Sequence, residues 1–318
     1  MKKAFFLNRK SGLSALNIGV LCGGRSSERK ISLKSGKAVW LALKEAGLKA
    51  TRLDPAAPHF LRKVKRVDVA FLVLHGHGGE DGQIQKFLRR HAIPYTGSGP
   101  LASLNAFDKV RAKRLFKKNS VPTADFTVLR KPSDVARLLR LRGPFFAKPV
   151  ADGSSVGAFA VENPLKSSDK LRQALARFGP LLVEPRIDGR EFTVGVLGRK
   201  ALPVIELLPS RDFFDYKAKY TPGLTRYDVP ANIPARLSRN LQRIALKAHQ
   251  ALQLSDFSRV DIMMSQNGEI YVLEANSLPG MTAMSLLPKA AAVSGIAFPE
   301  LCKRIVRMAL EPKPRGKV

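Results

Sequence analysis

A predicted β-hairpin near the end of the chain carries three side chains whose oxygens could bind a metal ion. Asp261 lies on its first strand, and Glu274 and Asn276 lie at the end of its second. Residues two apart on a strand face the same side, and strand pairing can bring Asp261 opposite them. Magnesium prefers such oxygen ligands. The pattern indicates a magnesium site, although an ion-pair network with Arg259 would use the same carboxylates.

A second candidate is the short buried segment Phe145 to Pro149, which carries Lys148 and leads into the loop Asp152 to Gly157 (DGSSVG). Backbone N–H groups and hydroxyls of such a loop can bind phosphate oxygens, and the lysine adds a positive charge. The loop is not a Walker loop, because the Gly-Lys-Ser/Thr ending is absent. Alone, a Gly-Ser loop is most often a simple turn.

A third candidate is the strand Leu182 to Ile187, in which Glu184 is followed by an exposed backbone edge. Glu191 comes soon after, where it could bind ribose hydroxyls. The order of a lysine, a Gly-Ser loop, a strand with an acidic residue and an Asp and Glu-x-Asn hairpin resembles the ATP-grasp superfamily.

Longer motifs resemble the D-alanine:D-alanine ligase family within that superfamily. They are Gly23 to Arg29 (GGRSSER), His75 to Gly82 (HGHGGEDG), Pro94 to Gly99 (PYTGSG), Phe213 to Tyr220 (FFDYKAKY) and Glu274 to Thr282 (EANSLPGMT). The resemblance runs from about Asn17 to Leu310. Because several motifs are long and uncommon, chance agreement in this order is implausible.

The resemblance implies ATP as a substrate and two Mg²⁺ ions, for which Mn²⁺ can substitute. Glu274 would bridge the ions, with Asp261 and Asn276 completing the metal site. Adenine would contact Glu184 and the backbone of Pro185 to Ile187. The ATP-binding residues would be Lys109, Lys148, Ser154, Ser155, Glu184, Pro185, Ile187, Glu191 and Lys219.

The resemblance also implies that an acyl phosphate of a first D-alanine is attacked by the amine of a second. Arg259 and the Gly280 N–H would stabilise the oxyanion, and Glu28 would hold the first ammonium group. The catalytic residues would be Glu28, Ser154, Lys219, Tyr220, Arg259 and Gly280, and the substrate-binding residues Glu28, His75, Arg259 and Ser285. In isolation, His75 would be read as a strand-end histidine bonded to backbone.

The long segment Pro209 to Pro230 is predicted to be a loop that folds over the site and excludes water from the acyl phosphate. A flexible surface excursion is the alternative, but four aromatic side chains between Phe213 and Tyr220 favour docking. Tyr220 favours an amine as second substrate, since depsipeptide-forming relatives typically have a histidine in this loop.

Three positions depart from the family pattern and bear on substrate preference. Lys30 stands where relatives often have an acidic residue, His77 where an arginine is common, and Met284 where a polar residue often precedes the serine. The expected product is D-alanyl-D-alanine for peptidoglycan precursor synthesis. A D-alanine:D-lactate or D-alanine:D-serine ligase is the alternative.

Alternating strand and helix patterns over the first hundred residues predict an open parallel α/β domain, with both loops of interest at the carboxyl ends of strands. Beyond it the pattern changes to short strands, a basic helix from Asp108 to Lys118 and a hairpin turning at Asn267-Gly268. The predicted fold is α/β and α+β, an ATP-grasp fold with domains 1–108 (substrate), 109–191 (central) and 192–318 (catalytic).

The chain of 318 residues is strongly basic, with 55 Lys and Arg against 25 Asp and Glu and a formal net charge of +30. Such a charge attracts polyanions. No zinc-finger, helix-turn-helix or aromatic-studded basic motif accompanies it, so we expect no specific nucleic-acid partner. A nucleic-acid-binding protein on a decayed ATP-grasp fold is the alternative from another functional class.

The remaining features concern location and assembly. Cys22 and Cys302 lie far apart without metal or CxxC spacing, which fits a reducing compartment. The apolar run after Met1 is broken by Asn8-Arg9-Lys10, unlike a signal peptide, and no segment reaches the ~18 apolar residues of a membrane span. We therefore expect a cytoplasmic protein without a membrane partner and, by the resemblance, a homodimer.

Overall fold

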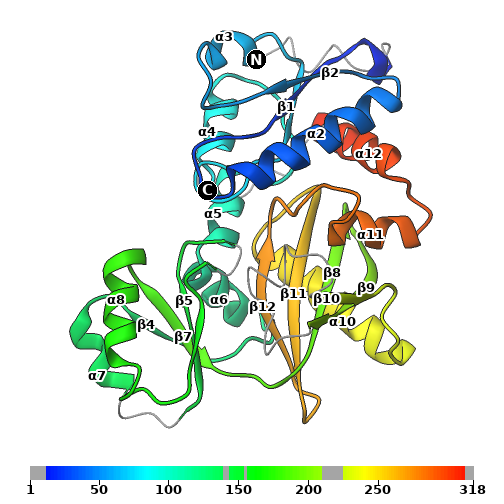
Figure 1. The fold of residues 1–318 in the computed structure, drawn as a ribbon. Helices are drawn as coiled ribbons and strands as arrows, with labels where there is room; N and C mark the ends of the chain where they lie inside the picture. The colour runs from blue at the N-terminus through cyan, green and yellow to red at the C-terminus, as the bar shows by residue number, and fades with distance from the viewer. Residues whose placement is uncertain (1–11, 139–142, 154–155, 210–224, 312–318) are drawn as a thin grey trace.

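The computed structural model describes residues 12–138, 143–153, 156–209 and 225–311. The candidate site residues Ser154, Ser155, Lys219 and Tyr220 lie outside these ranges, as does most of the predicted closing loop. The described chain forms three β-sheets, which follow one another along the sequence (Figure 1).

The first sheet is parallel and has the strand order β2-β1-β3. Its strands are β1 (Asn17–Leu21), β2 (Lys49–Leu53) and β3 (Val69–Leu72), and the helices of this part are α2 (Arg29–Glu45), α3 (Phe60–Val64), α4 (Gln83–Arg90) and α5 (Pro100–Phe107), after the short 3-10 helix η1 (Leu13–Ala15). All four residues of β3 are buried, as expected for a parallel strand covered on both faces. The predicted open α/β arrangement is confirmed.

Helix α2 shows how the sequence sets these elements. Its buried positions include Val39 and Leu43 on one stripe, and Gly47 ends it with a φ of 74°. This left-handed conformation lets the Leu48 N–H return to the Leu43 carbonyl at 2.9 Å. The last helix of the chain, α12 (Phe298–Leu310), packs against α2 (Figure 1).

The second sheet is antiparallel and has the order β4-β7-β5-β6. It consists of β4 (Thr127–Leu129), β7 (Leu181–Pro185), β5 (Phe145–Pro149) and β6 (Phe159–Val161), with the 3-10 helix η2 (Pro132–Asp134) and the helices α7 (Val135–Leu138) and α8 (Ser168–Phe178) packed on it. The sequence did not predict β4. Helix α6 (Lys109–Lys118) precedes this sheet, and Asp108 caps it by accepting a hydrogen bond from the Arg111 N–H at 2.9 Å.

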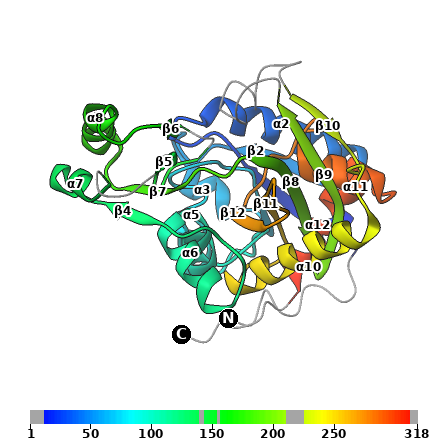
Figure 2. The same ribbon diagram turned by 90° about the horizontal axis from the view of Figure 1, so that it is seen from below.

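The third sheet is antiparallel and has the order β10-β9-β8-β11-β12. Its strands are β8 (Gly189–Leu197), β9 (Lys200–Pro209), β10 (Thr225–Asp228), β11 (Phe257–Ser265) and β12 (Ile270–Asn276), and its helices are α10 (Ala235–Ala251) and α11 (Leu286–Val293). Helix α10 covers one face (Figure 2), where Phe192, Val260 and Ile262 belong to a shared core. The intervening residues of β8 and β11, including Glu191 and Asp261, face the other side.

The predicted loop Pro209 to Pro230 is wrong at its end, because Thr225–Asp228 forms strand β10. This strand pairs antiparallel with the edge strand β9 over four residues, from Thr225 opposite Pro209 to Asp228 opposite Glu206. Residues 225–228 lack the alternation of apolar and polar side chains that predicts a strand. They form one because the edge of β9 offers backbone hydrogen-bond partners. None of the described helices is both long and apolar enough to cross a bilayer.

Gly36 on α2 allows a close contact between this helix and Cys22, the residue after β1. A Cβ at Gly36 would lie 2.3 Å from the Cys22 Cβ, so we expect Gly36→Ala to reduce the free energy of unfolding by about 1–3 kcal/mol through overpacking. Gly99→Ala is the control, because a Cβ there meets no atom within 4 Å. Urea unfolding of both variants measures the difference, and equal stabilities would contradict the close contact.

Candidate active site

A cavity of about 520 Å³ lies between the second and third sheets, a size typical of small-molecule sites. The described residues that line it include eight of the predicted site residues: Lys109, Lys148, Glu184, Pro185, Ile187, Glu191, Asp261 and Glu274. The structure thus brings the lysines, the acidic strand and the metal hairpin to one place, as the sequence predicted.

Both sheets also contribute apolar walls to the cavity: Phe146, Val156, Ala158, Ala160, Leu207, Leu208, Met263 and Leu273. Lysine and carboxylate side chains also line the cavity, among them Lys109 and Glu274, which are 3.9 Å apart. Apolar walls together with lysine side chains suit a ligand that has a ring system and an anionic tail.

Lys148 is held in the cavity by a buried ion-pair triad. The Glu184 carboxylate pairs with Lys148 of β5 and lies 2.5 Å from the Nζ of Lys113 on α6. Burial acts to raise the pKa of Glu184, but the two lysine charges outweigh it and the pKa is lowered. Burial lowers the pKa of Lys113, because it outweighs the attraction of the Glu184 charge. Burial is also the largest single influence on Lys148 and acts to lower its pKa, but Glu184, Glu274 and Glu191 together outweigh it, so the pKa of Lys148 is raised.

Lys109 connects the loop after β5 with the hairpin. Its Nζ donates a hydrogen bond to the Asp152 carbonyl at 2.6 Å and lies 3.9 Å from Glu274 Oε2. Lys109 is the first residue of α6. The start of this helix therefore places the Lys109 ammonium group between the loop and the hairpin.

The hairpin has the predicted register. Asp261 pairs with Glu274 and Arg259 with Asn276, with an irregularity directly after Asp261. The Asn276 Nδ2 donates to Asp261 Oδ2 at 3.1 Å. The ion pair with Arg259, which was the alternative interpretation of these carboxylates, is also present. The Arg259 guanidinium donates two hydrogen bonds to Asp261, at 2.8 and 2.7 Å.

The donor set of the hairpin fits a hard divalent cation. Asp261 and Glu274 are carboxylates on the cavity wall, and the Asn276 bond to Asp261 uses the amide nitrogen and leaves its oxygen for a metal. Magnesium typically takes one or two carboxylates together with phosphate oxygens. Among the described residues, no group of three or more His, Cys, Asp and Glu side chains could hold a metal, so this set of two carboxylates and an amide remains the candidate.

Glu28 forms a second corner, beside the Gly-Ser loop. Cβ atoms built at Gly153 and Gly76 would lie 2.8 and 3.0 Å from Glu28 Oε2. The backbones of these two glycines therefore lie close to the Glu28 carboxylate, which is buried. The loop before α2 is fixed at its start, where the Gly23 N–H donates to Ser32 Oγ and the Gly24 N–H to Asp54 Oδ1, both at 2.9 Å.

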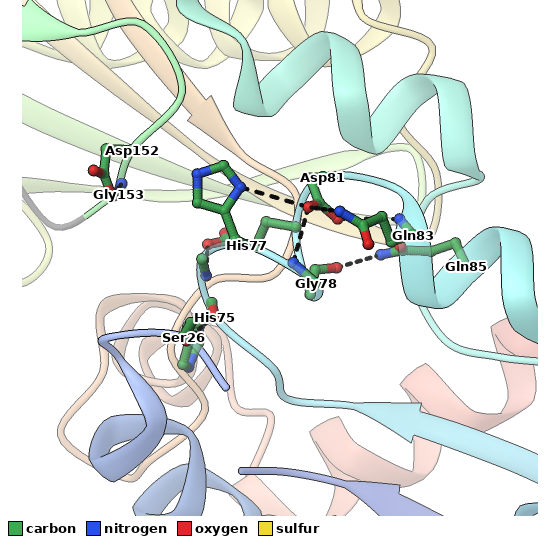
Figure 3. Close-up of polar contacts among 12 residues, drawn as sticks. Ser26, His75, His77, Gly78, Asp81, Gln83, Gln85, Asp152 and Gly153 are labelled. Carbon is green, nitrogen blue, oxygen red and sulfur yellow. Dashed lines mark hydrogen bonds and ion pairs between the residues drawn. The ribbon is translucent and has the colours of Figure 1, made fainter. Parts of the chain in front are cut away.

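The loop after β3 supports this corner (Figure 3). Asp81 accepts from the Gly78 N–H at 2.8 Å and lies 3.6 Å from His77 Nδ1, and the Gln85 side chain donates to the Gly79 carbonyl at 2.7 Å. His77, the position where relatives often have arginine, lies edge-on to the ring of Phe107. These bonds order the turn that carries His75 and Glu80.

His75 and Glu80 have strongly shifted pKa values. Burial lowers the pKa of His75 to about 4, with Arg259 adding to the effect, and its Nε2 is buried without a partner in the described chain. Burial and the Glu28 charge raise the pKa of Glu80 to about 8, although Glu80 accepts a bond from the Gly76 N–H at 2.8 Å. At neutral pH, His75 is therefore uncharged and Glu80 largely protonated.

Gly280 and Ser285 form a third corner, before α11. Thr282 donates from its N–H to Ser285 Oγ at 3.0 Å, and a Cβ at Gly280 would lie 2.9 Å from that oxygen. The two predicted residues are thus neighbours, although neither lines the large cavity among its described residues. His75 connects this corner to the loop after β3, because it forms a hydrogen bond with the Leu278 backbone.

The sequence missed four residues of the site. Lys113 is 1% exposed, and its position one helical turn after Lys109 could have indicated a shared face. Glu80 lies inside a recognised motif but was given no role. Arg190 and Glu206 both line the cavity and form a two-bond ion pair at 2.6 and 2.7 Å, which no sequence signal indicates because they lie on neighbouring strands.

Two family models match the chain: the D-ala D-ala ligase N-terminus over residues 49–98 and the D-ala D-ala ligase C-terminus over residues 115–307. The chain belongs to the D-alanine–D-alanine ligase family. The predicted family, the prediction of a ligase and the ATP-grasp fold are confirmed.

Individual family members are similar over nearly their whole length. The D-alanine–D-alanine ligases of Citrifermentans bemidjiense and Geotalea uraniireducens are 42% and 43% identical, over 93% of this chain and 97% and 96% of theirs. The Bacillus anthracis D-alanine–D-alanine ligase complexed with ATP is 30% identical with a TM-score of 0.82, covering 93% of this chain and 98% of that one. VanG D-Ala:D-Ser ligase from Enterococcus faecalis is 27% identical with a TM-score of 0.80, covering 92% and 99%.

We expect Lys113→Met to be strongly destabilising, although Lys113 itself does not line the cavity. Removing one partner of a buried ion pair costs about 3–5 kcal/mol. In this variant Glu184 would keep its ion pair with Lys148 but lose the one with residue 113. Lys117→Met is the matched control, since its pair with Asp125 is exposed and should contribute at most about 1 kcal/mol. Thermal unfolding compares the two, and similar losses would contradict the importance of the triad.

Proposed function

We propose that this family member joins two D-alanine molecules with ATP as the energy source, through a D-alanyl phosphate. The observation that carries the proposal is the junction at Lys109, which contacts the Gly-Ser loop and lies beside Glu274. A phosphate chain bound there would reach the lysines, the hairpin and, through Gly153, the Glu28 corner. The names of the similar ligases, one of them complexed with ATP, support it.

ATP would bind in the cavity between the sheets. The apolar walls would contact adenine near Glu184, Pro185 and Ile187, and Glu191 would accept from the ribose hydroxyls. Lys109 and Lys148 would bind the phosphates. In this arrangement Glu184 also has a positioning role, because it holds the Lys148 ammonium group in place.

Asp261, Glu274 and Asn276 would hold two Mg²⁺ ions, or Mn²⁺ in their place. Bound there, the metal would neutralise the negative charge that separates a carboxylate from the γ-phosphate. The protein contributes the rigid spacing of the ligands, because the hairpin register fixes Asp261 opposite Glu274. Lys109, beside Glu274, adds positive charge on the side of the loop.

The amino acids would bind at the Glu28 and Ser285 corners. Glu28 would hold the first ammonium group and Ser285 the carboxylate of the second D-alanine, with His75 between them as an uncharged donor or acceptor. Arg259 and the Gly280 N–H would stabilise the oxyanion formed when the second amine attacks. The proposed roles of Ser154, Ser155, Lys219 and Tyr220 concern residues outside the described ranges.

The cellular context follows from this reaction and is part of the proposal. A D-alanyl-D-alanine product would serve peptidoglycan precursor synthesis in the cytoplasm. A homodimer is the expected assembly, and the predicted division at residues 108 and 191 remains the proposed domain organisation.

Phosphate release tests the proposed reaction directly. With ATP, Mg²⁺ and D-alanine the protein should release phosphate and form the dipeptide, and D-alanine should be preferred to D-lactate and D-serine as second substrate at neutral pH. Glu274→Gln should lower kcat by at least about 100-fold, because it removes a charged metal ligand.

Glu269→Gln provides the matched control, since Glu269 belongs to the same hairpin but its exposed side chain accepts a hydrogen bond from the Tyr271 hydroxyl at 2.8 Å and does not line the cavity. It should leave phosphate release unchanged. Absence of phosphate release with every small D-amino acid would disprove the proposed reaction, and faster turnover with D-lactate or D-serine would reassign the second substrate.

The raised pKa of Glu80, about 8, predicts a loss of activity in alkaline solution. Above that pH Glu80 becomes an anion beside Glu28 and should repel the carboxylate and phosphate groups of the substrates, so kcat/KM for D-alanine should fall about tenfold per pH unit. Glu80→Gln, which mimics the neutral acid, should keep its activity there. A pH profile of both proteins measures this, and an unchanged alkaline fall in the variant would exclude Glu80 as its source.

A further inference from the structure

Helix α10 presents a row of cations on its outer face. Arg236, Arg239, Arg243 and Lys247 follow at spacings of three, four and four, so at 100° per residue they fall within an arc of about 80°. The three arginines are exposed and Lys247 is half-buried. The row is about 16 Å long at 1.5 Å per residue.

The positive charge of this row is not balanced locally. No Asp or Glu occurs between Asp228 and Asp256, and none of the four cations forms an ion pair with a described carboxylate. Arg243 donates to the Asn240 side chain and Lys247 to the Ser120 carbonyl, both at 2.8 Å. These are neutral acceptors, which leave the charge uncompensated.

The turn between β8 and β9 extends the row sideways. Arg199 and Lys200 are exposed there and line one shallow hollow together with Arg239, Arg243 and Lys247. Five cations from two elements therefore surround a single depression. Guanidinium groups in such an arrangement can bind phosphate oxygens with two parallel hydrogen bonds.

The rest of α10 argues against insertion into a membrane. Its apolar residues, among them Leu241, Ile244 and Ala248, are buried against the third sheet. The large exposed apolar side chains of the described chain lie elsewhere, so this face has none to insert into a bilayer, as interfacial helices do. The absence of aromatic residues from α10 also argues against stacking on unpaired bases.

We propose that the outer face of α10, with the β8–β9 turn, is a docking surface for the phosphate backbone of duplex nucleic acid, bound without regard to sequence. A duplex offers a linear series of phosphates to a linear row of cations, and binding would release counterions. The surface lies across the third sheet from the cavity. Occupancy of one side therefore leaves the other open, and the two activities can be tested separately.

The experiment measures the affinity of the full-length protein for a labelled 20-base-pair DNA duplex by fluorescence anisotropy between 50 and 200 mM salt. One variant neutralises the surface with glutamines at Lys200, Arg236, Arg239 and Arg243. A matched variant neutralises four exposed cations elsewhere, with glutamines at Arg62, Lys63, Lys65 and Arg66. Both lose the same total charge, and phosphate release reports whether each is folded.

The α10 variant should bind the duplex about tenfold or more weakly and lower the salt slope by about 3–4, at about 0.9 per phosphate contact. The matched variant should change the affinity less than about threefold. Equal losses in both variants, or no duplex binding by the unmodified protein at 50 mM salt, would overturn the proposal. So would binding to phosphatidylglycerol vesicles that the α10 variant loses while duplex binding persists. If the fourfold variant loses phosphate release, Arg239→Gln with Arg243→Gln repeats the comparison.

Discussion

The placement of a carboxylate between two lysines underlies the half of the site that we propose binds the nucleotide. Glu184, Lys113 and Lys148 come from β7, α6 and β5, and all three are largely removed from water. Such a triad is costly to desolvate and gains little over an apolar core. Its value lies in geometry, because it fixes a cation at the cavity wall and joins helix α6 to the second sheet. The same helix begins with Lys109, so one rigid element sets two positive charges.

The half of the site that we propose binds the amino acids contains carboxyl groups where the other half has lysines. Glu28 and Glu80 both contact the turn at Gly76, and their proximity is tolerated because one of them holds a proton. Arg259 lies between the halves, where its fork onto Asp261 removes part of that carboxylate's charge and its field acts on His75 and Glu80. The described part of the site therefore balances charge through buried ion pairs and a protonated carboxyl group, and not through solvent.

Much of this arrangement could be predicted from the sequence. The Asn-Gly turn and strand alternation predicted the hairpin and its register, and long motifs predicted the family and eight residues of the cavity wall. Lys113 was missed because a lysine on a basic helix usually faces solvent, and its burial depends on Glu184, more than 70 positions away. Strand β10 was missed because its order comes from the edge of β9, which local sequence does not reveal. The same holds for Arg190 and Glu206, whose pairing depends on sheet neighbours.

The contact between Gly153 and Glu28 makes the nucleotide loop and the amino-acid pocket share one wall. A ligand that moves the loop changes the room around the carboxylate, and a ligand that moves the carboxylate changes the loop. Thermodynamic linkage requires each effect on affinity to be matched by an equal reciprocal effect. Gly153 thus lies where the two binding steps can influence each other, because a side chain there would meet the Glu28 carboxylate.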